Sequence, residues 1–182
     1  MRIPLWTRTP TAVGSTKQSA DRGWLGIYLN DHLAMATGGT ELARRAARGS
    51  SWHREALATI ADELAADRSA LKHIMQSLEV PTRSYKQAGA WAGEKVGRLK
   101  PNGRLISRSP VSDVLELEGL RIMVEGNAAC WRLLRRLALA AGYDRLDRVL
   151  LDRLMEKAER QAKQLEELRI STAVEVFGGY SG

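Results

Sequence analysis

The stretch LNDHLAMATGGTELARRAA, residues 29–47, has the spacing of an amphipathic helix but carries two adjacent glycines, Gly38 and Gly39, near its centre. Glycine inside a helix costs about 1 kcal/mol relative to alanine, so a helix that keeps two of them needs a compensating contact. Ala36, Thr40 and Ala43 lie on the same side of this helix. We interpret that side as a small-residue face that lets a neighbouring helix approach closely.

Helical periodicity defines four long segments in the chain. The link between the first and second segments is very short, as is the link between the third and fourth, so each pair is predicted to form an antiparallel hairpin. About thirty residues separate the second segment from the third. The sequence therefore predicts an all-α four-helix bundle, with helices at about 24–48, 52–79, 111–142 and 144–177.

The 182 residues are sufficient for one domain with a small accessory element. Residues 1–22 include two prolines and have no helical period, so we predict a flexible basic N-terminal arm. The bundle is expected to span 23–178, with a crossover at about 80–111 that includes a short accessory helix in YKQAGAWAGEKVG, and a tail at 179–182. A four-helix bundle of other connectivity, with the accessory segment packed on one side, is the alternative.

Cysteine usage and hydropathy exclude several classes of protein. The single cysteine, Cys130, excludes an internal disulfide framework and a cysteine-based zinc site. The first twenty residues have no apolar run that could form a signal-peptide core. No stretch approaches the ~20 apolar residues needed to cross a bilayer. We therefore expect a soluble, cytoplasmic protein without a membrane span.

Polar residues interrupt three of the four apolar seams near their midpoints. These residues are Asp67, Asn127 (or Ala128) and Gln161. In the first helix the midpoint falls at Ala36 and Thr40, and the same seam includes His32 or Leu33. Antiparallel packing brings helix midpoints to roughly the same level, so a buried polar layer of His32, Asp67, Asn127 and Gln161 is predicted. Such a layer can fix helix register, bind a metal, or line a pocket for a small molecule.

Several segments resemble the helices of the ferritin-like superfamily. LNDHLAMA is similar to the start of its first helix, DELAADR and KAERQAKQLEEL to its Glu-x-x-His segments, and LELEGLRIMVEG to its third helix. The resemblance implies a ferritin-like bundle whose carboxylates and histidines hold two metal ions. The stretch AWAGEKVGRLKPNGRLISRSPVSDVLELEGL, residues 90–120, is similar to uncharacterised proteins of high-GC actinobacteria.

The ligand set that the resemblance implies is incomplete in this chain. Ala36 stands where the first helix would carry its inward Glu, and Ala66 stands where a His would follow Glu63. Depending on the register, the last helix offers Ala158 with Gln161 or Glu159 with Ala162, and neither is a ligand pair. No cofactor is therefore predicted. The alternative is a divalent metal held by a partial set drawn from Glu63, Asp67, Glu118 and Glu125.

The predicted crossover is strongly basic. Its cationic residues are opposed only by Glu94 and are interleaved with Tyr85 and Trp91. One interpretation is a solvated segment whose charges compensate acidic helix faces. The other is a contact surface for nucleic-acid backbone, anionic lipid or an acidic protein. The residues concerned are Arg83, Lys86, Lys95, Arg98, Lys100, Arg104 and Arg108.

These patterns favour a non-enzymatic helical bundle that self-associates or binds a protein partner. No catalytic residues are assigned, because no nucleophile has a suitable base near it in the sequence. Two alternatives remain open. The first is a metal-binding oxidoreductase or storage bundle of the di-iron or manganese type. The second is a nucleic-acid-associated protein that binds without sequence specificity through the basic crossover.

Overall fold

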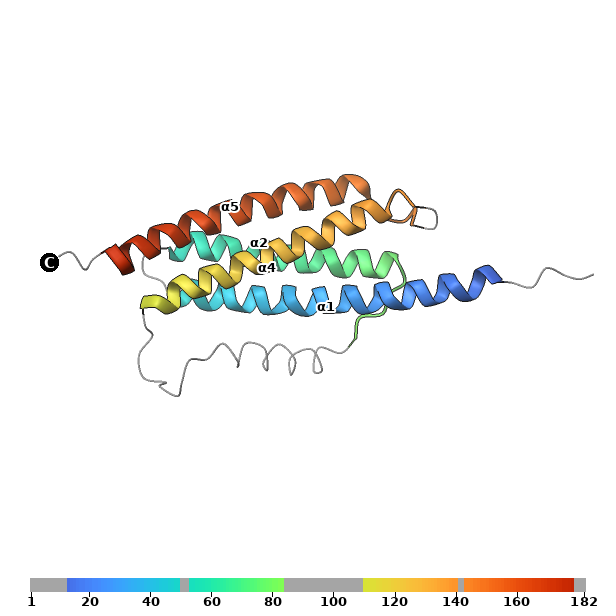
Figure 1. The fold of residues 1–182 in the computed structure, drawn as a ribbon, viewed down its shortest axis with the longest axis horizontal. Coiled ribbons are helices and arrows are strands. Elements are labelled where there is room, and N and C mark those ends of the chain that lie inside the picture. Colours follow the sequence, from blue (N-terminus) through green and yellow to red (C-terminus); the bar gives the residue numbers. More distant parts are fainter. Residues whose placement is uncertain (1–12, 50–52, 84–109, 141–142, 179–182) are drawn as a thin grey trace, which may run out of the picture.

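The computed structural model describes residues 13–49, 53–83, 110–140 and 143–178, and within these ranges the chain forms four helices and no strand (Figure 1). The all-α prediction is therefore confirmed for the described residues. No helix in these ranges combines the length and apolar character needed to cross a membrane. The helices are α1 (Val13–Gly49), α2 (Arg54–Ser77), α4 (Pro110–Leu137) and α5 (Arg148–Gly178).

The first helix is longer than its apolar pattern predicts. It begins at Val13, eleven residues before the predicted start at Trp24, so residues 13–22 belong to α1 and not to an arm. In Figure 1 this N-terminal part extends past the ends of the other helices. Apolar periodicity arises from packing against neighbours, so a helical extension beyond them leaves little trace in the pattern. Residues 1–12 and the predicted tail at 179–182 lie outside the described residues.

The last helix starts later than predicted because Asp147 caps it. The backbone N–H groups of Val149 and Leu150 donate to Asp147 Oδ1 at 2.9 and 3.1 Å. Such a cap satisfies helix donors that have no partner within the helix. Because the helix begins after Asp147 and not near Asp144, Leu151 is fully buried in the core, while the predicted Leu150 is only partly buried.

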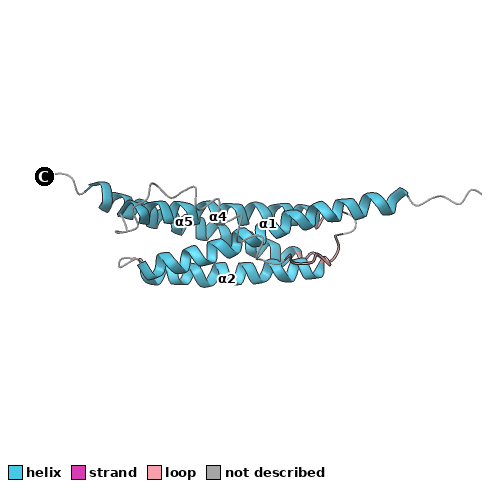
Figure 2. Ribbon diagram, turned by 90° about the horizontal axis from the view of Figure 1, so that it is seen from below, coloured by secondary structure: helices cyan, strands magenta, loops and turns pink. Residues whose placement is uncertain are grey.

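Neighbouring helices in the bundle run antiparallel. α1 packs on α2 and on α4, and α4 packs on α5 (Figures 1 and 2). Arg45 of α1 pairs with Glu116 of α4. Farther along α4, a Cβ built onto Gly126 would contact Met35 of α1. Residue numbers therefore rise along α4 as they fall along α1. Hydrogen bonds from Gln161 to Glu63 and Asp67 place α5 beside α2.

The connection between the two hairpins must therefore run from one end of the bundle to the other. It begins after α2, where Asn30 Nδ2 of α1 donates a hydrogen bond to the Pro81 carbonyl. It ends at the start of α4, where Glu116 pairs with Arg45 of α1. α2 and α4 consequently run in the same direction on diagonally opposite corners. Residues 84–109, which include the predicted accessory helix, lie outside the described residues.

The core follows the predicted seams closely. Eight of the buried side chains come from α2, including Leu57, Ile60, Leu64, Asp67 and Leu71. Among the described residues, Trp131 is the largest fully buried side chain, with 1% of its surface exposed. Alternating spacings of three and four residues locate a helix face that is buried along its length, which is why the prediction holds here.

The small-residue face of α1 contacts α4, but only one of its two glycines takes part. A Cβ added at Gly39 would lie 3.2 Å from Met123 Sδ, and one added at Gly126 would lie 2.8 Å from Met35 Cε. Glycines on both helices therefore permit a close approach. A Cβ at Gly38 would meet nothing within 4 Å, so the close-packing interpretation is wrong for Gly38.

We expect Gly38→Ala to raise the free energy of unfolding by up to about 1 kcal/mol, because alanine favours helix and the added methyl has room. Gly39→Ala should gain less, because its methyl must displace the Met123 thioether. Urea denaturation of both variants measures the difference. Equal stabilisation by the two substitutions would contradict the close approach of α1 and α4 at Gly39.

Candidate functional site

A cluster of four polar side chains joins α2 to α5 in the middle of the bundle. Asp67 is only 2% exposed, and its Oδ1 forms an ion pair with Lys157 Nζ. Gln161 Nε2 donates to Asp67 Oδ2 at 3.2 Å and to Glu63 Oε2 at 2.9 Å. We call Glu63, Asp67, Lys157 and Gln161 the polar cluster.

Helix geometry explains why these four residues meet. Glu63 and Asp67 are four residues apart on α2, and Lys157 and Gln161 are four apart on α5, so each pair lies on one face of its helix. Asp67 and Gln161 occupy core positions of their seams. The side chain of Lys157 is 22% exposed and lies at the edge of the interface, where its aliphatic stem can reach inward.

The polar cluster offsets part of the cost of burying a carboxylate. Burial raises the pKa of Asp67, and the nearby negative charge of Glu63 raises it further. The hydrogen bond and positive charge of Lys157, together with the hydrogen bond from Gln161, oppose the increase without cancelling it. Lys157 is thus the principal group that favours an ionised Asp67.

Hydrogen-bond donors are scarce within the cluster. The amide of Gln161 directs its NH₂ group at both carboxylates, and its Oε1 is buried with no hydrogen-bond partner among the described residues. One ammonium group and one amide therefore serve two carboxyl groups. A substitution that removes either donor should leave buried acceptors unsatisfied.

Among the described residues, Asn127 and His32 form no hydrogen bond or ion pair with the polar cluster. Asn127 is buried on α4, where the antiparallel register places it near the level of Gln161. The core position of α1 is taken by Leu33, whereas His32 is partly exposed and its ring lies 4.4 Å from that of Tyr28. Burial lowers the pKa of His32, and the charge of Asp31 opposes this. His32 therefore lies outside the polar cluster.

The four candidate metal ligands are not brought together. Glu63 and Asp67 share the polar cluster, but Glu118 and Glu125 are exposed on α4. Within the described ranges, no three His, Cys, Asp or Glu side chains gather closely enough to hold a metal ion. Glu118 and Glu125 lie on the face of α4 that points away from the core, apart from Glu63 and Asp67.

Comparisons with known proteins assign the chain to no family. No protein-family model matches it. Searches of curated proteins and of solved structures found no match either. The contacts of the polar cluster and the surface of the bundle are therefore the observations that bear on function.

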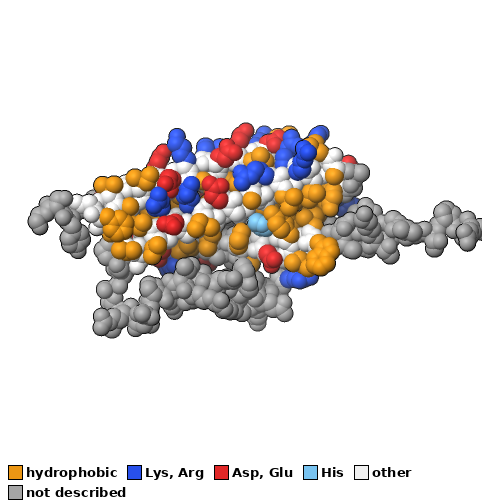
Figure 3. Space-filling view, in the orientation of Figure 1, with side chains coloured by type: hydrophobic (Ala, Val, Ile, Leu, Met, Phe, Trp, Pro, Cys, Tyr) orange, Lys and Arg blue, Asp and Glu red, His pale blue; other side chains and the backbone are white. Residues whose placement is uncertain are grey.

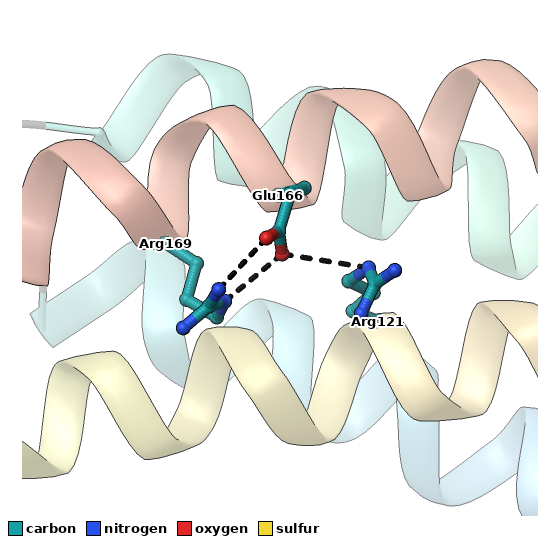
Figure 4. Close-up of polar contacts among 3 residues, drawn as sticks. All are labelled: Arg121, Glu166 and Arg169. Carbon is teal, nitrogen blue, oxygen red and sulfur yellow. Dashed lines mark hydrogen bonds and ion pairs between the residues drawn. The ribbon is translucent and has the colours of Figure 1, made fainter.

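A charged groove lies on the outer side of the α4–α5 hairpin. Its volume is about 470 Å³, and three alanines, Ala128, Ala158 and Ala162, contribute to its lining. Glu166 lies in its wall and accepts two hydrogen bonds from Arg169, at 2.7 and 2.9 Å, while Arg121 Nε lies 3.5 Å from Glu166 Oε2 (Figure 4). The hydrogen bonds from Arg169 lower the pKa of Glu166.

Of the predicted basic surface, only Arg83 lies among the described residues. Its side chain is exposed, and its backbone N–H donates to Asn30 Oδ1 at 2.7 Å. The Asn30 side chain also donates to the carbonyl oxygens of Gly26 and Pro81. Asn30 thus anchors the beginning of the crossover to α1. Lys86, Lys95, Arg98, Lys100, Arg104 and Arg108 lie outside the described residues.

Sequence reasoning missed Lys157 and the Arg121–Glu166–Arg169 contacts. Lys157 precedes Gln161 by four residues, and this spacing next to a predicted buried amide is a signal that could have identified it. The spacing of Glu166 and Arg169, three residues apart on one helix, is a similar signal. The contribution of Arg121 depends on how α4 packs against α5, which local spacing does not reveal.

Proposed function

We propose that this protein is a non-enzymatic, ferritin-like helical bundle with a degraded metal site, which acts by associating with itself or with a protein partner. The order of helix directions supports the ferritin-like part of the proposal. Two antiparallel hairpins joined by one end-to-end connection are typical of ferritin-like folds. A cytoplasmic location is part of the same proposal.

The contact between Lys157 and Asp67 is the observation that carries the proposal. Ferritin-like metalloproteins use mid-bundle carboxylates to bind cations. Here an ammonium group of the chain itself contacts the mid-bundle carboxylate, and an amide fills the facing position of α5. Lys157 and a metal ion would compete for Asp67 Oδ1. A lysine at this point therefore favours a structural role for the carboxylate.

Elemental analysis of protein purified without chelators tests the degraded metal site. We expect iron, manganese and zinc contents far below one ion per chain, and no change on Asp67→Asn. Asp62→Asn is the matched control, because Asp62 is an exposed carboxylate on the same helix. One ion per chain that is lost in Asp67→Asn and retained in Asp62→Asn would overturn the proposal in favour of a metal-binding oxidoreductase or storage protein.

Sedimentation equilibrium over a wide concentration range tests self-association. The proposal expects a mass above that of one chain, with a concentration dependence that reports the affinity. A monomer at every concentration would exclude self-association.

A further inference from the structure

The outer face of α4 carries a line of exposed apolar side chains. Val111, Leu115, Ile122 and Leu133 are between 39% and 64% exposed, and Ala129 is also exposed. Their spacings of four and seven residues place them on one side of the helix. We call these five residues the α4 stripe. Figure 3 shows hydrophobic side chains spread over the face of the molecule that contains α1 and α4, with many charged side chains along its α5 edge.

The α4 stripe is too regular to be a scatter of surface residues. Single exposed apolar side chains are common on proteins and need no explanation. A line from Val111 to Leu133 extends about 33 Å along the helix axis at 1.5 Å per residue. A contact of that length, extended over the neighbouring helices, is compatible with the roughly 800 Å² per partner of a standard interface. The stripe thus has the dimensions of a docking surface.

Charged residues beside the α4 stripe change sign along the helix. Glu118 and Glu125 lie in its first and middle parts, and Arg132 and Arg136 lie near its C-terminal end. All four are exposed. On a helical projection they fall on one flank of the stripe, the flank toward α5, where Arg121 meets Glu166. The flank therefore runs from acidic to basic.

This polarity makes the surface complementary to an antiparallel copy of itself. When two such helices lie antiparallel, the acidic part of each flank can face the basic part of the other, whereas a parallel pair puts like charges at the same level. A two-fold axis level with residue 125, between Ile122 and Ala129, would bring Leu115 of one copy toward Leu133 of the other and Glu118 toward Arg132. Two-fold interfaces require a self-complementary surface of this kind.

We propose that a second copy of this chain packs antiparallel on the α4 stripe and forms a two-fold symmetric dimer. The inference rests on the proposed self-association and specifies its surface and geometry. Ile122 lies closest to the proposed axis, so its side chain is buried by the partner. The pairing of Glu118 with Arg132 across the interface fixes the antiparallel direction.

Sedimentation equilibrium of full-length variants tests the apolar part of the interface. Ile122→Glu should raise the dimer dissociation constant by at least about 30-fold, the effect of losing a central hot-spot residue. Ala66→Glu is the control, because it adds the same carboxylate to an exposed position of α2, on the opposite corner of the bundle. Circular dichroism checks that both variants remain helical. An Ile122→Glu protein that dimerises as tightly as the parent would overturn the inference.

Charge reversal tests the direction of packing. Glu118→Arg and Arg132→Glu should each weaken the dimer, because each places like charges opposite one another. The double substitution should recover most of the affinity, because the reversed charges again face opposite partners. A double variant as weak as the sum of the single changes would rule out the antiparallel pairing.

The outcome for the parent protein separates the two proposals. A parent dimer that survives Ile122→Glu contradicts only the α4 stripe and leaves the proposed self-association intact. A parent that is monomeric at all concentrations contradicts self-association and the α4 interface together.

Discussion

Lys157→Met is expected to lower the free energy of unfolding by about 3 kcal/mol or more at neutral pH, because removing one partner of a buried ion pair leaves the other charge uncompensated. Asp67 is almost fully buried, and Lys157 is the only cation in contact with it among the described residues. Methionine retains much of the apolar stem, so that the measured loss reports the charge. Lys163→Met removes an exposed lysine of the same helix and should change stability by less than about 0.5 kcal/mol.

The pH dependence of this variant provides a second measurement. Burial already raises the pKa of Asp67, and loss of Lys157 should raise it further, so the folded state binds a proton more tightly than the unfolded chain. The bound proton stabilises the folded state at pH values below the pKa of Asp67 in the unfolded chain. This stabilisation is lost as the pH rises through the pKa of Asp67 in the folded state. The deficit of Lys157→Met should therefore be largest at neutral pH and shrink on acidification. Urea denaturation at several pH values measures this deficit in the free energy of unfolding. A deficit that did not change with pH would refute a charge effect.

Trp131→Ala is expected to cost about 3–5 kcal/mol, because it removes the largest fully buried side chain and leaves a cavity that helices can fill only in part. Trp24→Ala is the matched control, since Trp24 is 72% exposed and should change stability by less than about 0.5 kcal/mol. Thermal and urea denaturation measure both. Similar losses in the two variants would mean that Trp131 does not occupy the core.

Trp131→Phe separates the contribution of the ring from that of its polar atom. Trp131 Nε1 is buried and has no hydrogen-bond partner within the described ranges. Phenylalanine removes this unsatisfied donor while keeping an aromatic ring in the core, so the cost should fall well below that of alanine. A loss as large as that of Trp131→Ala would contradict this expectation.

The sequence predicted the apolar core and part of the polar cluster because both depend on periodicity. Asp67 and Gln161 interrupt otherwise aliphatic seams, so their spacing alone predicts that they are buried. Their mutual contact follows from antiparallel packing of helices at similar levels. Lys157 was missed because it stands at the edge of its seam, and its reach to Asp67 depends on the rotation of α5 against α2.

Other features depended on information that periodicity does not contain. The rotation of α4 directs Glu118 and Glu125 outward, and a pattern of alternating spacings does not fix which flanking glutamate turns inward. Gly38 and Gly39 are equivalent by composition, but they differ by 100° around the helix, and only Gly39 is directed at Met123. The start of α5 was set by a single capping side chain, Asp147.

The polar cluster also has a consequence for the order of folding. Contacts within each hairpin involve residues close in sequence, whereas Gln161 is separated from Asp67 by 94 residues and from Glu63 by 98. Local contacts form early, and contacts that close long loops form later. If the two hairpins docked one helical turn out of step, Asp67 would be buried away from Lys157. The ion pair therefore stabilises the native register of the two hairpins relative to one shifted by a helical turn.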